Sequence, residues 1–261
     1  MVGAAVGCGF AEVGLVGSPD ASTASERRSC LSDRSAMTTT IERRMPERTP
    51  FDGAYLGPPQ SGVTLYWLPL GAGGHLVRLN GRLYEAVAAR LAHRPVCDLY
   101  HSALEVVVPE GRFVIESAPI RASDGPDRGV VGEGPVGTRW AGRARIFRYE
   151  LRCWRDGFIP DVAEAVDSPR ILSHDRKTAR ELLTRVPDVP RPVWGRDELH
   201  AGEMWNSNSI VSWLLVRAGL QIESILPPAG GRAPGWDAGI VVARRGLARA
   251  LPRIHNQVAY R

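Results

Sequence analysis

The spacing of hydrophobic residues changes along the chain, from alternate positions in its middle to every third or fourth position beyond it. Apolar and polar residues alternate over 99–108 and 113–120 around a polar loop at 109–112, which predicts a β-hairpin. Residues 147–153 alternate in the same way and predict another strand. A short apolar run at 63–70, closed by a glycine-rich turn, predicts a strand before the hairpin.

Helical spacing flanks these strands. It predicts helices over 81–93, 173–186 and 206–218, each beginning at or just after a Ser or Asn suited to the N-cap, with Ser173 as the cap of the second. The tail, including 240–243, predicts loop and strand. Strands grouped in the middle with helices on both sides favour an α+β domain, in which an antiparallel sheet packs against helices.

The first 50 residues differ from the rest of the chain. Their opening lacks a basic region and contains Glu12 within its apolar stretch, so it is a poor signal peptide. Residues 21–50 are rich in Ser, Thr and Arg and have little to bury, so residues 1–50 are expected to be disordered. Because Met37 and Met45 are candidate start sites, we hypothesise that the preceding residues belong to an overextended reading frame. One globular domain is expected over 51–261.

Composition narrows the class of protein. The chain has 261 residues, of which 44% are hydrophobic and 23% charged, enough to bury a substantial core. Its four cysteines show no C-x-x-C spacing, which argues against a zinc or disulfide framework and favours a reducing, cytoplasmic setting. No stretch approaches the roughly 18–20 apolar residues of a membrane-spanning helix, so no membrane span is expected.

The net charge of +5 invites a nucleic-acid partner, but its distribution does not support one. Lys177 is the single lysine, and the arginines are spread among 28 acidic residues, a skew that a GC-rich coding sequence produces without selection for binding. The densest basic stretch is interrupted by Glu150 and Asp156, so a solvent-facing surface is its default explanation. Its basic residues are Arg139, Arg143, Arg145, Arg148, Arg152 and Arg155. No nucleic-acid partner is therefore expected.

Two polar positions combine reactive side chains with special locations. His101 begins a predicted strand, where a sheet would direct its imidazole outward. Ser207 lies at a predicted helix N-terminus, where free N–H groups and the positive end of the helix dipole stabilise a nucleophile or an oxyanion. Together they predict Ser207 as nucleophile and His101 as general base, with Asn206 and Asn208 as oxyanion or positioning groups.

The order of these motifs resembles the circularly permuted branch of the NlpC/papain-like superfamily, which includes lecithin:retinol acyltransferase-like and PPPDE-type domains. There a His-x-Ala/Gly strand precedes an Asn-Cys-Asn/Glu helix start. His101 matches the histidine, whereas Ser207 stands where cysteine is usual, over a resemblance of roughly 101–220. It implies a permuted papain-like fold and hydrolysis or transfer of an acyl group at an amide or ester. Serine departs from this pattern. A cysteine at a helix start can be a thiolate near neutral pH, whereas serine needs a well-oriented base to remove its proton.

The residue that would orient His101 is less clear from the sequence. Glu116 falls on the same strand face, but about four pairs away, which at roughly 3.3 Å per residue is too far without a bulge. Asp98 is a second candidate. A structural explanation of the same residues competes with the catalytic one. Asn and Ser are favoured helix caps, and His101 is then an ordinary strand-edge histidine.

Tryptophans near the proposed nucleophile suggest where a ligand would bind. Trp194 and Trp205 are predicted to line an apolar cleft for a small-molecule or peptide substrate, with Trp213 in that cleft or in the core. The loop between these two tryptophans also contains Asp197, Glu198, His200 and Glu203, but they lack recognised metal-ligand spacing, so no metal or cofactor is expected. Two functional hypotheses follow: a serine-dependent hydrolase or acyltransferase, or an inactive binding or scaffold protein with a tryptophan-lined groove. The oligomeric state is left open.

Overall fold

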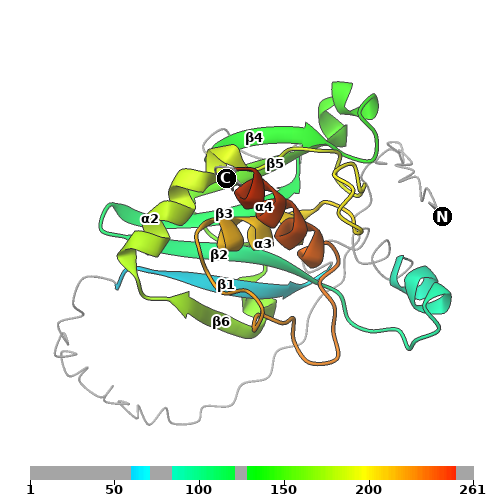
Figure 1. Cartoon of the computed structure of the whole chain (residues 1–261), viewed down its shortest axis with the longest axis horizontal. Coiled ribbons are helices and arrows are strands. Elements are labelled where there is room, and N and C mark those ends of the chain that lie inside the picture. Colours follow the sequence, from blue (N-terminus) through cyan, green and yellow to red (C-terminus); the bar gives the residue numbers. More distant parts are fainter. Residues whose placement is uncertain (1–59, 71–83, 121–127, 251–261) are drawn as a thin grey trace, which may run out of the picture. The chain divides into compact units, whose positions relative to one another are not determined.

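The computed structural model describes residues 60–70, 84–120 and 128–250, with side chains to residue 248. All described residues belong to one compact unit, Gly57–Arg261. The predicted disordered segment 1–50 and the predicted glycine-rich turn at 71–74 lie outside the described residues. Within this unit the fold is α+β, as the sequence predicts (Figure 1).

Six strands form one sheet in the order β4-β5-β3-β2-β1-β6, and every neighbouring pair is antiparallel. The strands are β1 (Gly62–Pro69), β2 (Tyr100–Val108), β3 (Gly111–Pro119), β4 (Val130–Pro135), β5 (Arg148–Arg155) and β6 (Val166–Ser173). The predicted hairpin is β2–β3, but Val108 pairs with Gly111, so its loop has two residues instead of four. Gly111 has φ of +146°, which glycine readily adopts and which lets β3 start early.

The sequence missed the two strands at the edges of the sheet. β4 contains two glycines and ends at Pro135, and β6 contains Pro169. Glycine and proline weaken the strand signal, and proline lacks the N–H that an interior strand would have to donate. These residues are tolerated here because an edge strand has a partner on one side alone, so both strands read as loop in the sequence.

Three named helices follow the sheet strands: α2 (Arg176–Arg185), α3 (Ser207–Arg217) and α4 (Trp236–Ala250). Residues 84–91 are also helical. The N-cap of α2 is Asp175, whose carboxylate accepts from the N–H groups of Lys177 and Thr178, whereas the predicted cap Ser173 ends β6.

The strand predicted at 240–243 is wrong, because these residues lie inside α4. Their run of four apolar residues is compatible with a strand or with a buried helix, and the sequence alone does not separate the two. Packing against α3 decides in favour of the helix, since Ala243 lies fully buried in the main core.

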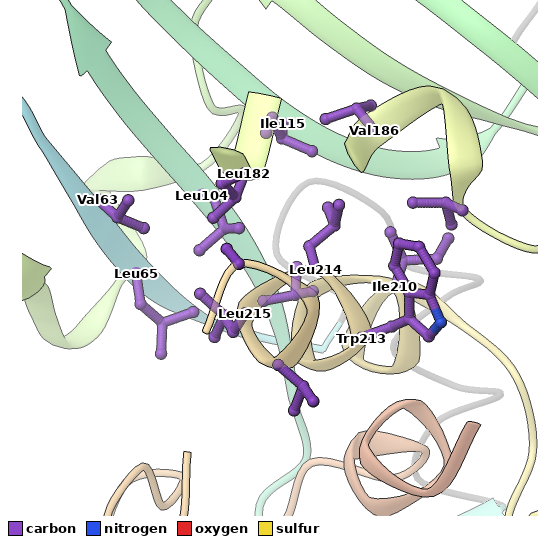
Figure 2. Close-up of a cluster of buried hydrophobic side chains, with 14 of the residues drawn as sticks. Val63, Leu65, Leu104, Ile115, Leu182, Val186, Ile210, Trp213, Leu214 and Leu215 are labelled. Carbon is purple, nitrogen blue, oxygen red and sulfur yellow. The ribbon is translucent and has the colours of Figure 1, made fainter. Parts of the chain in front are cut away.

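The main core lies between the sheet and α3. Ten of the eleven α3 residues are buried, because α3 packs against β2 and β3 on one side and α4 on the other. Figure 2 shows apolar α3 side chains packed with those of β1, β2, β3 and α2. The labelled residues are Val63, Leu65, Leu104, Ile115, Leu182, Val186, Ile210, Trp213, Leu214 and Leu215. We call this side of the sheet the helix face and the opposite side the back face.

Candidate functional site

The N-terminus of α3 is tied to its surroundings by polar side chains that the sequence marked as possible catalytic groups. Asn206 is the N-cap, and its Oδ1 accepts from the backbone N–H groups of Asn208 (2.9 Å) and Ser209 (3.3 Å). Ser209 Oγ in turn accepts from the Asn206 N–H at 3.1 Å, which completes a capping box. The Asn206 side-chain amide donates to the carbonyl oxygen of Pro234 at 2.8 Å. Asn206 therefore caps α3 and holds the loop before α4.

Asn208 joins α3 to β2 and to the same loop. Its Oδ1 accepts from Ser102 Oγ at 2.9 Å, and its Nδ2 donates to the carbonyl oxygens of Tyr100 and Pro234, each at 2.9 Å. Asn208 is 2% exposed, so these bonds are made away from water. Both amide hydrogens have acceptors within the protein, which leaves neither to stabilise an oxyanion.

The hydroxyl groups of Ser209 and Ser212 connect α3 to the start of α4. Ser209 Oγ lies 2.7 Å from the Gly235 carbonyl oxygen, and Ser212 Oγ donates to the Trp236 carbonyl oxygen at 2.7 Å. A Cβ on Gly239 would lie 2.1 Å from both the Ser209 carbonyl oxygen and Ser212 Oγ, so glycine permits this close approach of the two helices. We call the bonded set Asn206, Asn208, Ser209 and Ser212 the α3 joint.

Ser207, the predicted nucleophile, is the first residue of α3 and is 5% exposed. Within the described part of the chain, its hydroxyl has no hydrogen-bond partner. A serine acts as a nucleophile only when a base can take its proton, so its chemistry depends on which groups lie on the helix face.

His101, the predicted general base, lies on the back face. Its neighbour Ser102 bonds Asn208 on the helix face, and successive side chains of a strand point to opposite faces. The register gives the same result. Ser102 pairs with Trp67 of the main core, whereas His101 pairs with Leu68 of a small back-face core that also contains Ala103, Val114 and Ile159. The structure therefore does not bring His101 and Ser207 together.

The surroundings of His101 disfavour its charged form. Burial lowers the pKa of the imidazole to about 4, and the nearby Asp161 carboxylate opposes this shift without cancelling it. At neutral pH the ring is thus neutral and packed against the sheet. A neutral imidazole can still accept a proton, but a base with a pKa of about 4 is far from the value that suits catalysis near pH 7.

Glu116, the predicted orienting residue, also lies on the back face, where it binds arginine. The β2–β3 register places it closer to His101 than the sequence suggested, because the two-residue loop shifts the pairing. Its Oε1 accepts from Arg152 Nη1 at 3.0 Å. Arg152 also bonds Glu150 at 3.0 Å, and Glu150 accepts from Arg128 Nε at 2.7 Å.

These four charged residues form a buried ionic cluster that the sequence did not reveal as one. Each is less than a tenth exposed, and hydrogen bonds to Arg128 and then Arg152 keep the pKa of Glu150 below its ordinary value. The alternation of residues 147–153 was visible in the sequence and placed Glu150 and Arg152 on one side. The sequence predicted that this side faces solvent, because a local alternation of residues does not show whether another part of the chain covers it.

The tryptophans predicted to line a substrate cleft pack in or against the core. Trp205 is 2% exposed, and Trp194 contacts Tyr149 with the ring planes tilted by 50° and the ring centroids 4.9 Å apart. Trp213 is buried in the main core. The indole N–H groups of Trp67 and Trp205 are buried without an acceptor among the described residues. The aromatic rings near α3 therefore serve packing.

A further polar cluster, which sequence reasoning missed, holds residues 84–97 beside the α3 joint. Glu85 is almost fully buried, and hydrogen bonds from Arg94 first, then from Cys97, lower its pKa to about 2 despite the cost of burial. Arg232 lies between this carboxylate and Glu203, 3.9 Å from each, and Glu203 accepts from the Gly235 N–H at 2.9 Å. Burial and Glu85 raise the pKa of Cys97, so its thiol is poorly suited to nucleophilic attack.

The segment between β4 and β5 differs from these buried clusters because it exposes both apolar and basic side chains. We call residues 136–147 the basic tip; it contains the short 3₁₀ helices η1 (Ala141–Arg143) and η2 (Arg145–Phe147). Trp140 exposes 75% of its surface and Ile146 exposes 58%. Arg143 and Arg145 are also exposed. Figure 1 shows the tip in green, standing out beyond the end of β4.

Two further kinds of site are absent from the described residues. They contain no group of three or more His, Cys, Asp or Glu residues placed to hold a metal ion. No helix in this part of the chain combines the length and the apolar character needed to cross a membrane. Comparison with known proteins found no matching family model, no matching curated protein and no matching solved structure.

Proposed function

We propose that this chain is a binding protein in which the α3 N-terminus serves structure, and that it contacts its partner through the basic tip. The observation that carries the proposal is the position of His101 and Ser207 on opposite faces of the sheet. A general base must lie within hydrogen-bond reach of the proton that it removes. A strand and its packed side chains separate these two groups.

The state of the neighbouring groups supports the same conclusion. The side-chain amides of Asn206 and Asn208, the proposed oxyanion donors, already bind carbonyl oxygens of the protein. Glu116 binds Arg152. Acyl transfer at Ser207 would thus require new partners for three of the residues that the sequence placed in the mechanism, Asn206, Asn208 and Glu116.

Kinship with the permuted papain-like branch is part of the proposal. What supports it is the order of elements alone, an antiparallel strand followed by a buried helix that begins at residue 207 and packs on that sheet, since His101 does not face that helix. A descendant that kept this arrangement and lost the chemistry would have Ser207 where cysteine is usual. It would also be free to use the polar residues around it as caps, as the α3 joint does.

A serine-directed fluorophosphonate probe tests the absence of catalysis. We expect the native chain to be labelled no more strongly than Ser207→Ala. Ser224→Ala serves as the matched control, because Ser224 is exposed and lies outside α3. A second measurement uses Ser207→Cys, which restores the usual residue type. We expect this variant to gain no hydrolysis of acyl esters, because its thiol would have no imidazole beside it.

Either of two results would overturn the proposal. The first is strong labelling of the native chain that Ser207→Ala abolishes and Ser224→Ala leaves intact. The second is ester hydrolysis that depends on both residue 207 and His101. The first outcome would mean that Ser207 is a reactive nucleophile, and the second would mean that the histidine and the helix start come together in solution.

A further inference from the structure

The basic tip combines charge of one sign with exposed apolar groups. Between residues 136 and 147 the chain has three arginines and no aspartate or glutamate. Arg139 is paired with Glu198 through two hydrogen bonds of 2.8 and 2.9 Å. Arg143 and Arg145 have no ion pair or hydrogen bond from their side chains to another described residue. Two guanidinium groups without an acidic partner among the described residues therefore lie between Trp140 and Ile146 in the sequence.

The conformation of the tip is fixed by its backbone. Neither η1 nor η2 contains a buried residue. At the base, the Val136 N–H donates to the Phe147 carbonyl oxygen at 2.8 Å, and the Gly137 N–H donates to the Trp194 carbonyl oxygen at 3.0 Å. A segment with closed ends can present exposed side chains without a large further loss of entropy on binding.

The acidic residues beside the tip are bound to groups other than Arg143 and Arg145. Glu198 pairs with Arg139, and the Asp197 carboxylate accepts from the N–H groups of Ala201 and Gly202 at 2.6 and 2.9 Å. Arg196, on the same loop, donates to the Gly137 carbonyl oxygen at 2.8 Å, and its positive charge offsets the negative charge of Asp197.

We propose that the basic tip docks on an anionic lipid surface, with Trp140 and Ile146 entering the headgroup layer and Arg143 and Arg145 binding lipid phosphates. Tryptophan is favoured at the boundary between headgroups and acyl chains, and arginine is attracted to anionic lipids. A projecting, convex tip fits the flat surface of a bilayer, whereas a protein partner would need a matching groove. The inference rests on the proposed function, because it names the partner class of that binding surface.

Co-sedimentation of the full chain with vesicles tests the proposal. The two probes are vesicles of phosphatidylcholine alone and vesicles of phosphatidylcholine mixed with phosphatidylserine, and we expect binding to the second. An arginine near an anionic surface contributes about 1 kcal/mol, or about fivefold in partitioning. The double variant Arg143→Gln/Arg145→Gln should therefore bind about 25-fold more weakly, and added salt should weaken the native chain. Trp140→Ala should lose about tenfold or more.

Matched controls separate the tip from general surface effects. Phe158→Ala removes another exposed aromatic ring, and Arg176→Gln removes an exposed arginine from α2. Both controls should bind anionic vesicles as the native chain does. Equal binding of the native chain to both vesicle types, or equal binding of tip variants and controls, would overturn the proposal.

A soluble polyanion separates failure of this inference from failure of the proposed function. If the chain binds polyglutamate through Arg143 and Arg145 and ignores vesicles, the partner is an acidic protein; the lipid proposal is then overturned, and the binding function stands. If Ser207 instead reacts with the fluorophosphonate probe and supports ester hydrolysis, the proposed function fails whatever the vesicles show.

Discussion

The pH dependence of stability provides a direct test of where His101 lies. Its folded pKa of about 4 is well below the ordinary value of 6.5, because burial disfavours the imidazolium. Between these two values the unfolded chain binds the proton that the folded chain refuses. Stability therefore falls as the pH drops from about 6.5 towards about 4, and this loss is absent above that window.

The size of the effect follows from the two pKa values. Linkage gives a loss of up to about 2 kcal/mol in the free energy of unfolding at about pH 5, rising to about 3 kcal/mol at about pH 4. These are upper bounds, since His101 retains some solvent access and Asp161 lies near it. His101→Gln removes the titration and keeps a polar side chain. The native chain should thus lose stability relative to this variant as the pH falls.

Urea unfolding followed by tryptophan fluorescence measures this difference at several pH values. Comparing the two proteins at each pH removes the contribution of every other titrating group, including the carboxyl of Glu203. His174→Gln, at an exposed position, controls for the loss of a histidine as such. If the native chain and His101→Gln show the same pH dependence, the imidazole is solvated in the folded protein. The assignment of His101 to a packed back face would then be wrong.

Three further substitutions test the buried contacts by urea unfolding. Asn208→Ala should lower the free energy of unfolding by roughly 3–5 kcal/mol because it leaves buried polar groups unpaired, whereas Ser207→Ala should lower it by less than about 1 kcal/mol. Equal losses would mean that the hydrogen bonds of Asn208 in the α3 joint do not stabilise the fold. Gly235→Ala should cost at least about 2 kcal/mol, since φ is +85° and the new Cβ would lie 2.6 Å from an Asn206 oxygen. Gly230→Ala is the control for backbone strain alone, because Gly230 has φ of +76° and open space around it. A loss of stability there as large as at Gly235 would mean that the contact with Asn206 adds nothing. Glu150→Gln should cost roughly 3–5 kcal/mol by stranding buried arginines, and a loss below about 1 kcal/mol would mean that the cluster is solvated.

Local pattern was enough to predict the elements that have a clear period. The alternation of β2, β3 and β5 and the apolar stripe of α3 appear in the structure close to their predicted bounds. The elements that failed are those in which tertiary context overrides the local signal. The apolar run at 240–243 becomes helix because α4 packs on α3, and β4 and β6 are edge strands with glycine or proline.

For the candidate site, the sequence predicted the type of each element but not which face of the sheet each side chain would occupy. The sequence correctly placed His101 at the start of a strand and Ser207 at the start of a helix. It did not determine on which side of the sheet that helix would pack. The answer depends on contacts between residues about a hundred positions apart, such as Ser102 with Asn208, and these have no local signature.

The position of His101 along β2 favours the structural explanation of these residues over the catalytic one. A base able to reach the start of α3 has to stand at an even-numbered position of this strand, as Tyr100, Ser102 and Leu104 do, because these side chains occupy the helix face. His101 stands one residue away from that series and so faces the opposite side. A shift of one residue in strand register moves every side chain to the other face, so no small adjustment of rotamers would bring the imidazole to Ser207. The same polar residues that favour a nucleophile at a helix N-terminus also favour a cap. In this chain, the bonds of Asn206, Asn208 and Ser209 are those of a cap.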